Sequence, residues 1–247
     1  ESGMKLGEDV AEFYSATKYY PPIKAQAGDS ATDDPYFPRY TNLENMRSYP
    51  KLLEEGELVI ATEKVHGSNC RVGFVWHSDQ KQPTMMAGSR TLRRIEPEDP
   101  IEMVVNTYWF PHTLIGVKNL LANLQNQGHK QAILYGEVYG QGIQAYTYGE
   151  KRMNFRAFDL MLDGKYVDYP IFKSLCDQHQ VDQVPLVYEG AFSLEVIKGF
   201  SDGDSLIGGT HGREGVVVKP MVERADPKFG RVILKYIGDR YLFGKVA

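Results

Sequence analysis

A short apolar strand that ends in a lysine is the feature that most constrains the fold of this chain. Residues 58–62 are apolar and β-branched, which is typical of a buried strand, and Lys64 lies where that strand leaves the core. Gly67 allows a tight turn or a close backbone approach just after it. Side chains that can form hydrogen bonds surround the amine in sequence: Glu63, His66, Ser68 and Asn69. The stretch fits a reactive amine, and it fits equally an exposed lysine at a strand end.

The composition is that of an ordinary globular protein. The 247 residues suffice for one large α/β or α+β domain, alone or with a small appendage, and 42% of them are hydrophobic. The net charge is −4, so no broad basic field marks the chain as a nucleic-acid binder. Any polynucleotide must therefore meet a local basic patch or be bound with the help of another module.

The two cysteines and the hydropathy pattern bear on where the chain works. Cys70 and Cys176 are too few for a metal knuckle or a disulfide framework. We expect both to be reduced thiols, which favours an intracellular setting, in the cytoplasm or in the nucleoid or nucleus. No apolar run approaches the roughly 20 residues that a membrane-spanning helix needs, so we expect no membrane partner.

The start of the chain differs in character from the rest. Pro21 and Pro22, with a small polar run over residues 25–34, favour turns over helices. We therefore predict a linker or N-terminal extension over residues 1–38 and a single domain over residues 39–247.

The periodicity of the remaining chain predicts an α+β fold. Residues 70–76 alternate as the hairpin partner of strand 58–62, with the lysine segment at the turn. Asp163-Gly164 is a strong hairpin signal. No sustained βαβ repeat is present, so we expect antiparallel sheets flanked by helices. Further strands are expected over residues 84–91, 131–140, 154–160, 185–191, 214–220 and 232–237, and helices around Pro50 and over residues 101–110, 113–127, 171–180 and 193–198.

Two of these strands carry residues that suit a binding site. Glu137 emerges from an apolar strand between glycines, which is costly unless the carboxylate is paired or serves a site. Strict alternation along residues 154–160 puts Phe155, Ala157 and Asp159 on one face, and Arg156, Phe158 and Leu160 on the other. A Phe-x-x-Phe pattern by itself is more typical of a core.

Charged residues also mark the last two strands. Glu214 and Lys219 bracket a run of valines, an arrangement that an ordinary pair of rim residues would also give. Lys235 lies on the last strand, two residues before Ile237.

Taken in order, these stretches resemble the motifs of the covalent nucleotidyltransferases, the superfamily of ATP-dependent DNA ligases, RNA ligases and mRNA capping enzymes. The superfamily's attachment motif reads Lys-x-Asp-Gly, and the Lys-x-His-Gly-x-Asn form at residues 64–69 is similar to the RNA ligase 2-like branch. The Glu-Gly-x-Val-x-Lys-Pro sequence at residues 214–220 matches the fourth motif of the same branch. Five motifs in order make the resemblance specific.

The resemblance implies a fold and a set of site residues. The fold is the nucleotidyltransferase (ATP-grasp-like) fold, in which two antiparallel sheets enclose the nucleotide. Lys64 would be the catalytic nucleophile that forms lysyl-AMP, and we expect Glu137, Phe158, Glu214 and Lys235 to converge with it on one pocket. The nucleotide-binding residues would be Glu63, His66, Asn69, Arg90, Glu137, Phe158, Lys219 and Lys235, and the metal ligands Glu214 and Glu137.

Individual roles follow from the same motifs. Phe158 would stack on the purine, with Phe155 as the second candidate. Arg90 and Glu137 would contact the ribose, and Lys219 the phosphate end or the ribose. Lys235 would serve the α-phosphate. The family's fifth motif has a second lysine where this chain has Ile237, so Arg240 or Lys219 would have to replace it. Arg93 and Arg94, beside Arg90, fit phosphate contacts and a solvated charge run equally well.

The implied ligands and partners complete the expectation. ATP would be the nucleotide, and Mg²⁺ or Mn²⁺ suits carboxylate and phosphate oxygens. The partners would be RNA or RNA/DNA ends with a 5′-phosphate and a 3′-hydroxyl. Residues 16–22 resemble the connector after an N-terminal OB module, which the full-length protein would carry, and a monomer is expected. The alternatives are a GTP-using mRNA capping enzyme, a DNA ligase and, from another class, a non-catalytic nucleic-acid-binding module.

Overall fold

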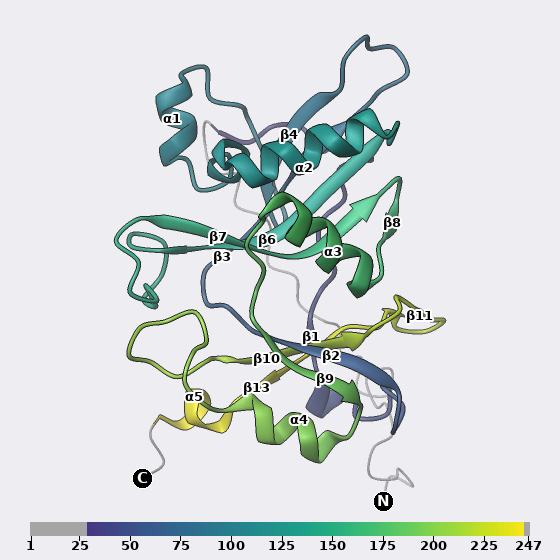
Figure 1. Cartoon of the computed structure of the whole chain (residues 1–247), viewed down its shortest axis with the longest axis vertical. Coiled ribbons are helices and arrows are strands. Elements are labelled where there is room, and N and C mark those ends of the chain that lie inside the picture. Colours follow the sequence, from purple (N-terminus) through teal and green to yellow (C-terminus); the bar gives the residue numbers. More distant parts are fainter. Residues whose placement is uncertain (1–28, 245–247) are drawn as a thin grey trace, which may run out of the picture.

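Two facing β-sheets, each covered by helices on its outer side, make up the fold of the computed structural model, which describes residues 29–244 (Figure 1). The upper sheet has the order β5-β4-β3-β6-β7-β8 and the lower sheet the order β1-β13-β10-β2-β9. The upper strands are β3 (Ser68–Val75), β4 (Thr84–Ser89), β5 (Arg93–Arg94), β6 (Gln131–Gly140), β7 (Met153–Leu162) and β8 (Lys165–Tyr166). The lower strands are β1 (Glu44–Asn45), β2 (Leu58–Glu63), β9 (Leu186–Ala191), β10 (Gly215–Pro220) and β13 (Leu234–Ile237).

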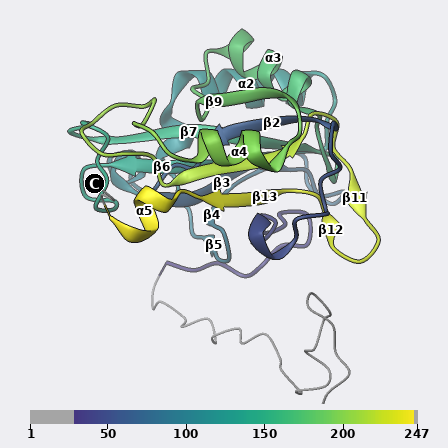
Figure 2. The ribbon, with the colours of Figure 1, turned by 90° about the horizontal axis from the view of Figure 1, so that it is seen from below.

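All neighbouring strands in the two sheets pair antiparallel, with the exception of the short parallel contact between β1 and β13. A separate hairpin, β11 (Ala225–Asp226) and β12 (Gly230–Arg231), extends beyond the lower sheet (Figure 2). The predicted α+β class with antiparallel sheets is thus confirmed.

The helices cover the outer faces of the two sheets. Helices α2 (Ile115–Asn126) and α3 (Tyr169–His179) lie over the upper sheet, and α4 (Leu194–Ser201) lies over the lower sheet (Figures 1 and 2). Apolar residues of α2 at three- and four-residue spacing are buried: Val117, Leu120, Leu121 and Leu124 belong to the core between the upper sheet and its helices. The remaining helices are α1 (Pro100–Val105), α5 (Asp239–Phe243) and the 3₁₀ turns η1 (Met46–Ser48) and η2 (Phe110–Thr113). None of the helices within residues 29–244 is long and apolar enough to span a bilayer.

Two predicted helices are shorter than the sequence suggested. The helix expected over residues 101–110 ends at Val105, because Asn106 is extended and its side chain accepts hydrogen bonds from the backbone N–H groups of Tyr108 and Trp109. Near Pro50, only the 3₁₀ turn η1 forms. Proline lacks the backbone N–H that a continuing helix would need.

The predicted hairpin between residues 58–62 and 70–76 is wrong. Strand β2 pairs with β9 and β10 in the lower sheet, whereas β3 pairs with β4 and β6 in the upper sheet. Residues 64–67 therefore cross from one sheet to the other. Gly67 makes the crossing possible, since a Cβ there would lie 2.3 Å from the carbonyl oxygen of Val138. The close approach predicted for this glycine is confirmed.

Strand β7 contains a bulge that breaks the alternation expected from its sequence. Tyr135 pairs with Asp159 and Gly136 pairs with Ala157, so Phe158 has no partner on β6. As a result Phe158 and Asp159 both face the space between the sheets, where they line the same cavity. The prediction that Phe158 and Asp159 lie on opposite faces is corrected.

The described part of the predicted linker packs against the domain. Ser30 forms a bridge with Arg94, Arg93 donates to the carbonyl of Thr32, and Phe37 is 2% exposed in the core. Arg93 and Arg94 thus hold the incoming chain. The connector suggested at residues 16–22 lies outside the described residues.

Candidate active site

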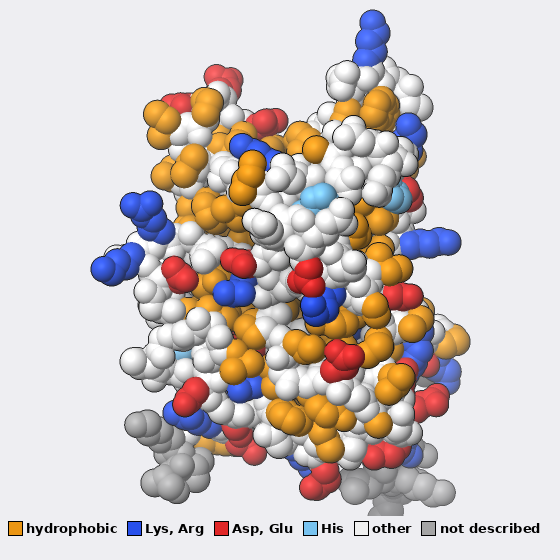
Figure 3. Space-filling view, in the orientation of Figure 1, with side chains coloured by type: hydrophobic (Ala, Val, Ile, Leu, Met, Phe, Trp, Pro, Cys, Tyr) orange, Lys and Arg blue, Asp and Glu red, His pale blue; other side chains and the backbone are white. Residues whose placement is uncertain are grey.

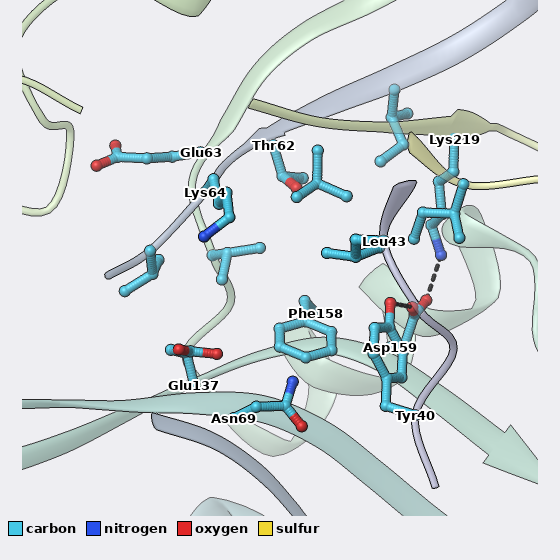
Figure 4. A pocket seen from close by; sticks show the side chains of 15 residues that line it. Tyr40, Leu43, Thr62, Glu63, Lys64, Asn69, Glu137, Phe158, Asp159 and Lys219 are labelled. Carbon is cyan, nitrogen blue, oxygen red and sulfur yellow. Dashed lines mark hydrogen bonds and ion pairs between the residues drawn. The ribbon is translucent and has the colours of Figure 1, made fainter. Parts of the chain in front are cut away.

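A cavity opens between the two sheets, and the residues that line it include most of those that the sequence singled out. Lys64 and Glu137 lie at one end, Lys219, Asp159 and Tyr40 lie at the other, and the ring of Phe158 lies between them (Figure 4). The lining residues are Tyr40, Leu43, Ile60, Thr62, Glu63, Lys64, Val65, Asn69, Glu137, Phe158, Asp159, Val184, Val217, Lys219 and Ile233. The arrangement gives an apolar middle with a charged group at each end.

Lys64 is held at its end of the cavity by the carboxylate of Glu214, which directly precedes β10, a neighbour of β2 in the lower sheet. Its Nζ lies 2.7 Å from Glu214 Oε1, and its backbone N–H donates to the carbonyl of Gly215 at 2.9 Å. The second oxygen of Glu214 lies 3.3 Å from Nδ1 of His66. Because β10 pairs directly with β2, the register of the lower sheet brings Glu214 to the nucleophile candidate.

Glu137 completes this end from the upper sheet. Burial raises the pKa of Glu137 to about 8; the charge of Lys64 opposes the rise, while the charge of Glu214 adds to it. The backbone N–H of Gly67 donates to the carboxylate. The charge of Glu214, which precedes β10 of the lower sheet, is therefore close enough to disfavour ionisation of Glu137.

This raised pKa gives a prediction for the stability of the metal-free protein. An ionised Glu137 destabilises the fold, so stability present below the ordinary value near 4.5 is lost as pH rises towards 8. At about 1.4 kcal/mol per pKa unit, and allowing for partial exposure, we expect a loss of roughly 3 kcal/mol relative to Glu137→Gln. Urea unfolding in EDTA from pH 4.5 to 9 measures it, with the exposed Glu195→Gln as control. Parallel stability curves for the wild type and Glu137→Gln would contradict the assignment.

Lys235 contributes a second cation near Lys64. Burial lowers the pKa of Lys235, and the positive charges of Lys64 and Arg90 lower it further, while Glu214 opposes them. Lys235 does not line the cavity itself, and Arg90 is exposed on the turn after β4. The charges of Lys64, Glu214 and Arg90 nevertheless all act on Lys235.

Neither of the suggested replacements for the second lysine at Ile237 is available at this end. Arg240 Nη1 lies 3.2 Å from Asp204 Oδ1, on the surface. Lys219 is 2% exposed at the far end of the cavity and pairs with two carboxylates. Ile237 itself is 9% exposed. Arg90 is the further cation whose charge reaches Lys235.

The far end of the cavity is a buried network of two acids and two bases. Lys219 donates to Asp159 and, at 2.9 Å, to Glu223, while Arg231 lies 2.9 Å from Asp159 and 2.6 Å from Glu223. Tyr40 donates its hydroxyl to Asp159. Burial alone would raise the pKa of Asp159, but the charges of Arg231 and Lys219 outweigh it and hold that pKa below its usual value.

The two phenylalanine candidates lie on opposite sides of β7. Phe158 faces the cavity, and its ring centroid lies 4.9 Å from that of Tyr40. Phe155 is 1% exposed in the core between the upper sheet and its helices, so it cannot reach a ligand in the cavity. Asn69 also lines the cavity, and its side-chain oxygen is buried without a hydrogen-bond partner among the described residues. That unpaired oxygen is available to a ligand.

Glu63 and His66 turn away from the centre of the cavity. Figure 4 shows Glu63 pointing away from Phe158, and its carboxylate accepts hydrogen bonds from Ser205 Oγ at 2.6 Å and from the backbone N–H of Leu206 at 2.7 Å. The His66 ring contacts Glu214, as described, and lies 5.0 Å from the ring of Tyr146. Neither side chain is directed at a ligand between the sheets.

Sequence reasoning missed the residues that complete the far end, which are Tyr40, Asp159, Glu223 and Arg231. Asp159 follows Phe158 directly, so it was within the motif but was assigned to the wrong face. Tyr40 and Arg231 lie outside the resembling motifs. They are separated by nearly the whole domain in sequence, so no local pattern indicated that they would meet Asp159.

The donor set at the Lys64 end fits a divalent cation. Within residues 29–244 no group of three or more His, Cys, Asp or Glu side chains is arranged around a common point, so the protein offers only the two carboxylates of Glu137 and Glu214. Burial is the main cause of the raised pKa of Glu137 and the charge of Glu214 adds to it, and a bound cation would offset both effects. Oxygen ligands that leave room for phosphate oxygens suit Mg²⁺ or Mn²⁺.

Comparison with known proteins agrees with this geometry. Structures of an RNA ligase from Naegleria gruberi match at TM-scores of 0.70 for a variant with ATP and Mn and for another with AMP and Mn, and of 0.67 for the protein with PPi. Identity is 24%, 24% and 23%, and each match covers 98% of this chain and 68% of the other. No curated protein sequence matches significantly. The nucleotidyltransferase fold of RNA ligases is thereby shown. The RNA ligase family model matches residues 57–237, which span both sheets and the cavity, and the chain therefore belongs to the RNA ligase family of ATP-dependent nucleotidyltransferases.

Proposed function

We propose that this chain is the catalytic domain of an ATP-dependent RNA ligase of the RNA ligase 2-like type, with Lys64 as its nucleophile. The amine of Lys64 at the end of a cavity with an aromatic middle is the observation that carries the proposal. Lys64 would form lysyl-AMP, AMP would pass to a 5′-phosphate end, and a 3′-hydroxyl would then displace AMP and seal the strand.

The first step needs an amine without its extra proton. Free lysine has a pKa near 10.4, so the ammonium must give up a proton before its lone pair can attack. Glu214 Oε1 contacts Nζ at 2.7 Å and orients the amine, and the proton is lost to solvent. The amine then bonds to the α-phosphorus of ATP, the bond to the β-phosphate oxygen breaks, and pyrophosphate leaves.

The remaining residues would bind the nucleotide. The purine stacks on Phe158, and the free oxygen of Asn69 and the carboxylate of Glu137 meet the ribose. Lys235 and Arg90 contribute positive charge near the α-phosphate. Lys219 lies at the base end of this pose, which favours a role next to the purine over the phosphate contact expected from sequence. A divalent cation held by Glu137 and Glu214 would neutralise phosphate charge.

The polynucleotide would meet only local positive charge. On the face shown in Figure 3, basic and acidic side chains are interspersed, in line with the net charge of −4. Recognition of RNA ends would therefore depend on residues around Lys64 and on an N-terminal OB module in the full-length protein. The proposal includes a monomeric domain over residues 39–247 and an intracellular setting, which the free, buried thiols of Cys70 and Cys176 suit.

The nucleotide and the polynucleotide can be identified in one labelling experiment. The protein is incubated with Mg²⁺ or Mn²⁺ and α-labelled ATP or GTP, and then with nicked or single-stranded RNA or DNA that carries a 5′-phosphate. We expect label from ATP alone on the protein, and then its transfer to RNA followed by sealing. A GMP adduct would indicate a capping enzyme, transfer to DNA alone a DNA ligase, and polynucleotide binding without any adduct a non-catalytic module.

A further inference from the structure

Two loops meet beside Lys64 and form what we call the loop clasp. One is residues 141–152, between β6 and β7, and the other is residues 202–213, between α4 and β10; both project on the same side of the molecule (Figure 1). The rings of Tyr146 and His211 stack with centroids 4.1 Å apart and planes at 19°. The loops therefore touch across the gap between the two sheets.

Glycines allow the two backbones to approach closely. A Cβ added to Gly209 would lie 3.2 Å from the Cα of Tyr148, and Gly209 has a φ of +86° that other residues rarely adopt. A Cβ added to Gly208, which has a φ of +141°, would lie 3.1 Å from the carbonyl oxygen of Tyr148. The contact is thus built into the backbone of residues 202–213 and does not depend on the ring stack alone.

Each loop is also fastened to a residue that flanks Lys64. The carboxylate of Glu63 accepts the hydroxyl of Ser205 and the N–H of Leu206, and the backbone N–H of His66 donates to the hydroxyl of Tyr148 at 2.7 Å. Glu63 is 1% exposed, and a buried carboxylate is costly unless hydrogen bonds satisfy it. The loop at residues 202–213 supplies both of these bonds.

Together with the backbone of residues 63–66, these contacts form a closed circuit that includes Lys64. The circuit runs from Glu63 through residues 205–211 to Tyr146 and Tyr148, and back to His66. Residues 64–67 lie between β2 and β3 and belong to neither sheet. Their path is therefore fixed in part by the clasp, and the direction of the Lys64 side chain with it.

We propose that the loop clasp orients Lys64 for attack, and that Glu63 and Tyr148 are positioning residues that act through it without contacting the nucleotide. This inference depends on the proposed function, since it concerns the rate at which Lys64 accepts AMP. It changes the role that the sequence assigned to Glu63, and it gives Tyr148 and Ser205 a role that no motif indicated. Misplacement of a reacting group by a fraction of an ångström slows a reaction without weakening substrate binding.

The test uses variants remote from the nucleophile in sequence. Ser205→Ala removes the hydroxyl that Glu63 accepts, and Tyr148→Phe removes the acceptor of the His66 N–H; Tyr188→Phe removes a hydroxyl bond of the same 2.7 Å length from β9 and serves as control. We expect Ser205→Ala and Tyr148→Phe to slow lysine adenylation at saturating ATP about tenfold, with KM for ATP changed less than about twofold. Ser205→Thr, which keeps the hydroxyl, should restore the rate, and Glu63→Gln should not add to Ser205→Ala in the double variant.

The outcomes separate this inference from the proposed function. If the wild-type protein forms no AMP adduct, the proposed function fails before the variants are read. If it does, and Glu63→Gln is slow while Ser205→Ala and Tyr148→Phe adenylate at the wild-type rate, Glu63 contacts the nucleotide directly and the clasp has no positioning role. Equal slowing in Tyr188→Phe, or a larger change in KM than in the rate, would likewise overturn it.

Discussion

A Lys64→Arg variant is expected to lose nucleotidyl transfer by at least about a thousandfold while keeping its fold. Arginine preserves the positive charge at this position, so Glu214, whose Oε1 lies 2.7 Å from the Lys64 Nζ, keeps a cationic partner. Its guanidinium remains protonated at any working pH and offers no lone pair for attack on phosphorus. The loss would therefore report on nucleophilicity and not on charge.

The rate of AMP transfer from labelled ATP to the protein measures this effect. Lys173→Arg is the matched control, because Lys173 is exposed on α3 and pairs with Asp177 one turn away. The thermal unfolding midpoints of both variants should lie within a few degrees of the wild-type midpoint. Residual transfer in Lys64→Arg at a tenth of the wild-type rate or more would show that another group accepts the nucleotide.

An Asp159→Ala variant is expected to lose about 3 to 5 kcal/mol of unfolding free energy. Removal of this carboxylate leaves Lys219 and Arg231 with Glu223 as their remaining acid, although the side chains of both bases are less than 10% exposed. It also leaves the buried hydroxyl of Tyr40 without its acceptor. Breaking one member of such a network costs more than the network contributes as a whole, because the charges left behind stay buried.

Urea unfolding at pH 7 tests this value against Asp177→Ala, which breaks an exposed pair on α3 and should cost less than about 1 kcal/mol. The pH dependence has a definite sign. The pKa of Asp159 is lowered on folding, so its contribution is present above the ordinary value of 3.8 and is lost as pH falls through the folded value. A difference between wild type and Asp159→Ala that does not shrink in acid would contradict this explanation.

Local sequence patterns predicted the elements well but not which strands become neighbours. Strand β6 has the predicted bounds, 131–140, and a helix, α2 (Ile115–Asn126), forms within the predicted range 113–127. The pairing of residues 58–62 with 70–76 was wrong because two strand-like runs joined by a segment with a glycine look the same whether they form a hairpin or enter different sheets. The sheet that each strand enters is decided by its pairing partners elsewhere in the chain. Strand β2 pairs with β10, and β3 pairs with β6.

The cavity residues show the same division. Lys64, Glu137 and Phe158 line one cavity and Glu214 contacts Lys64, as the motifs led us to expect. The bulge in β7 left no trace in sequence, so Asp159 was placed on the wrong face and its network was missed. Glu63 was read as a nucleotide ligand from its position beside Lys64, yet its partner Ser205 is 142 residues away and could not be inferred locally.

The attachment site of the nucleotide can be mapped directly. The protein, incubated with ATP and Mg²⁺ or Mn²⁺, is digested and its peptides are analysed by mass spectrometry, together with the stability of the adduct to acid and base. We predict a single AMP adduct on Lys64, joined by a phosphorus–nitrogen bond that acid cleaves and base does not. An AMP adduct on any other residue, or an adduct with the acid stability and base lability of an ester, would contradict the assignment of Lys64 as the nucleophile.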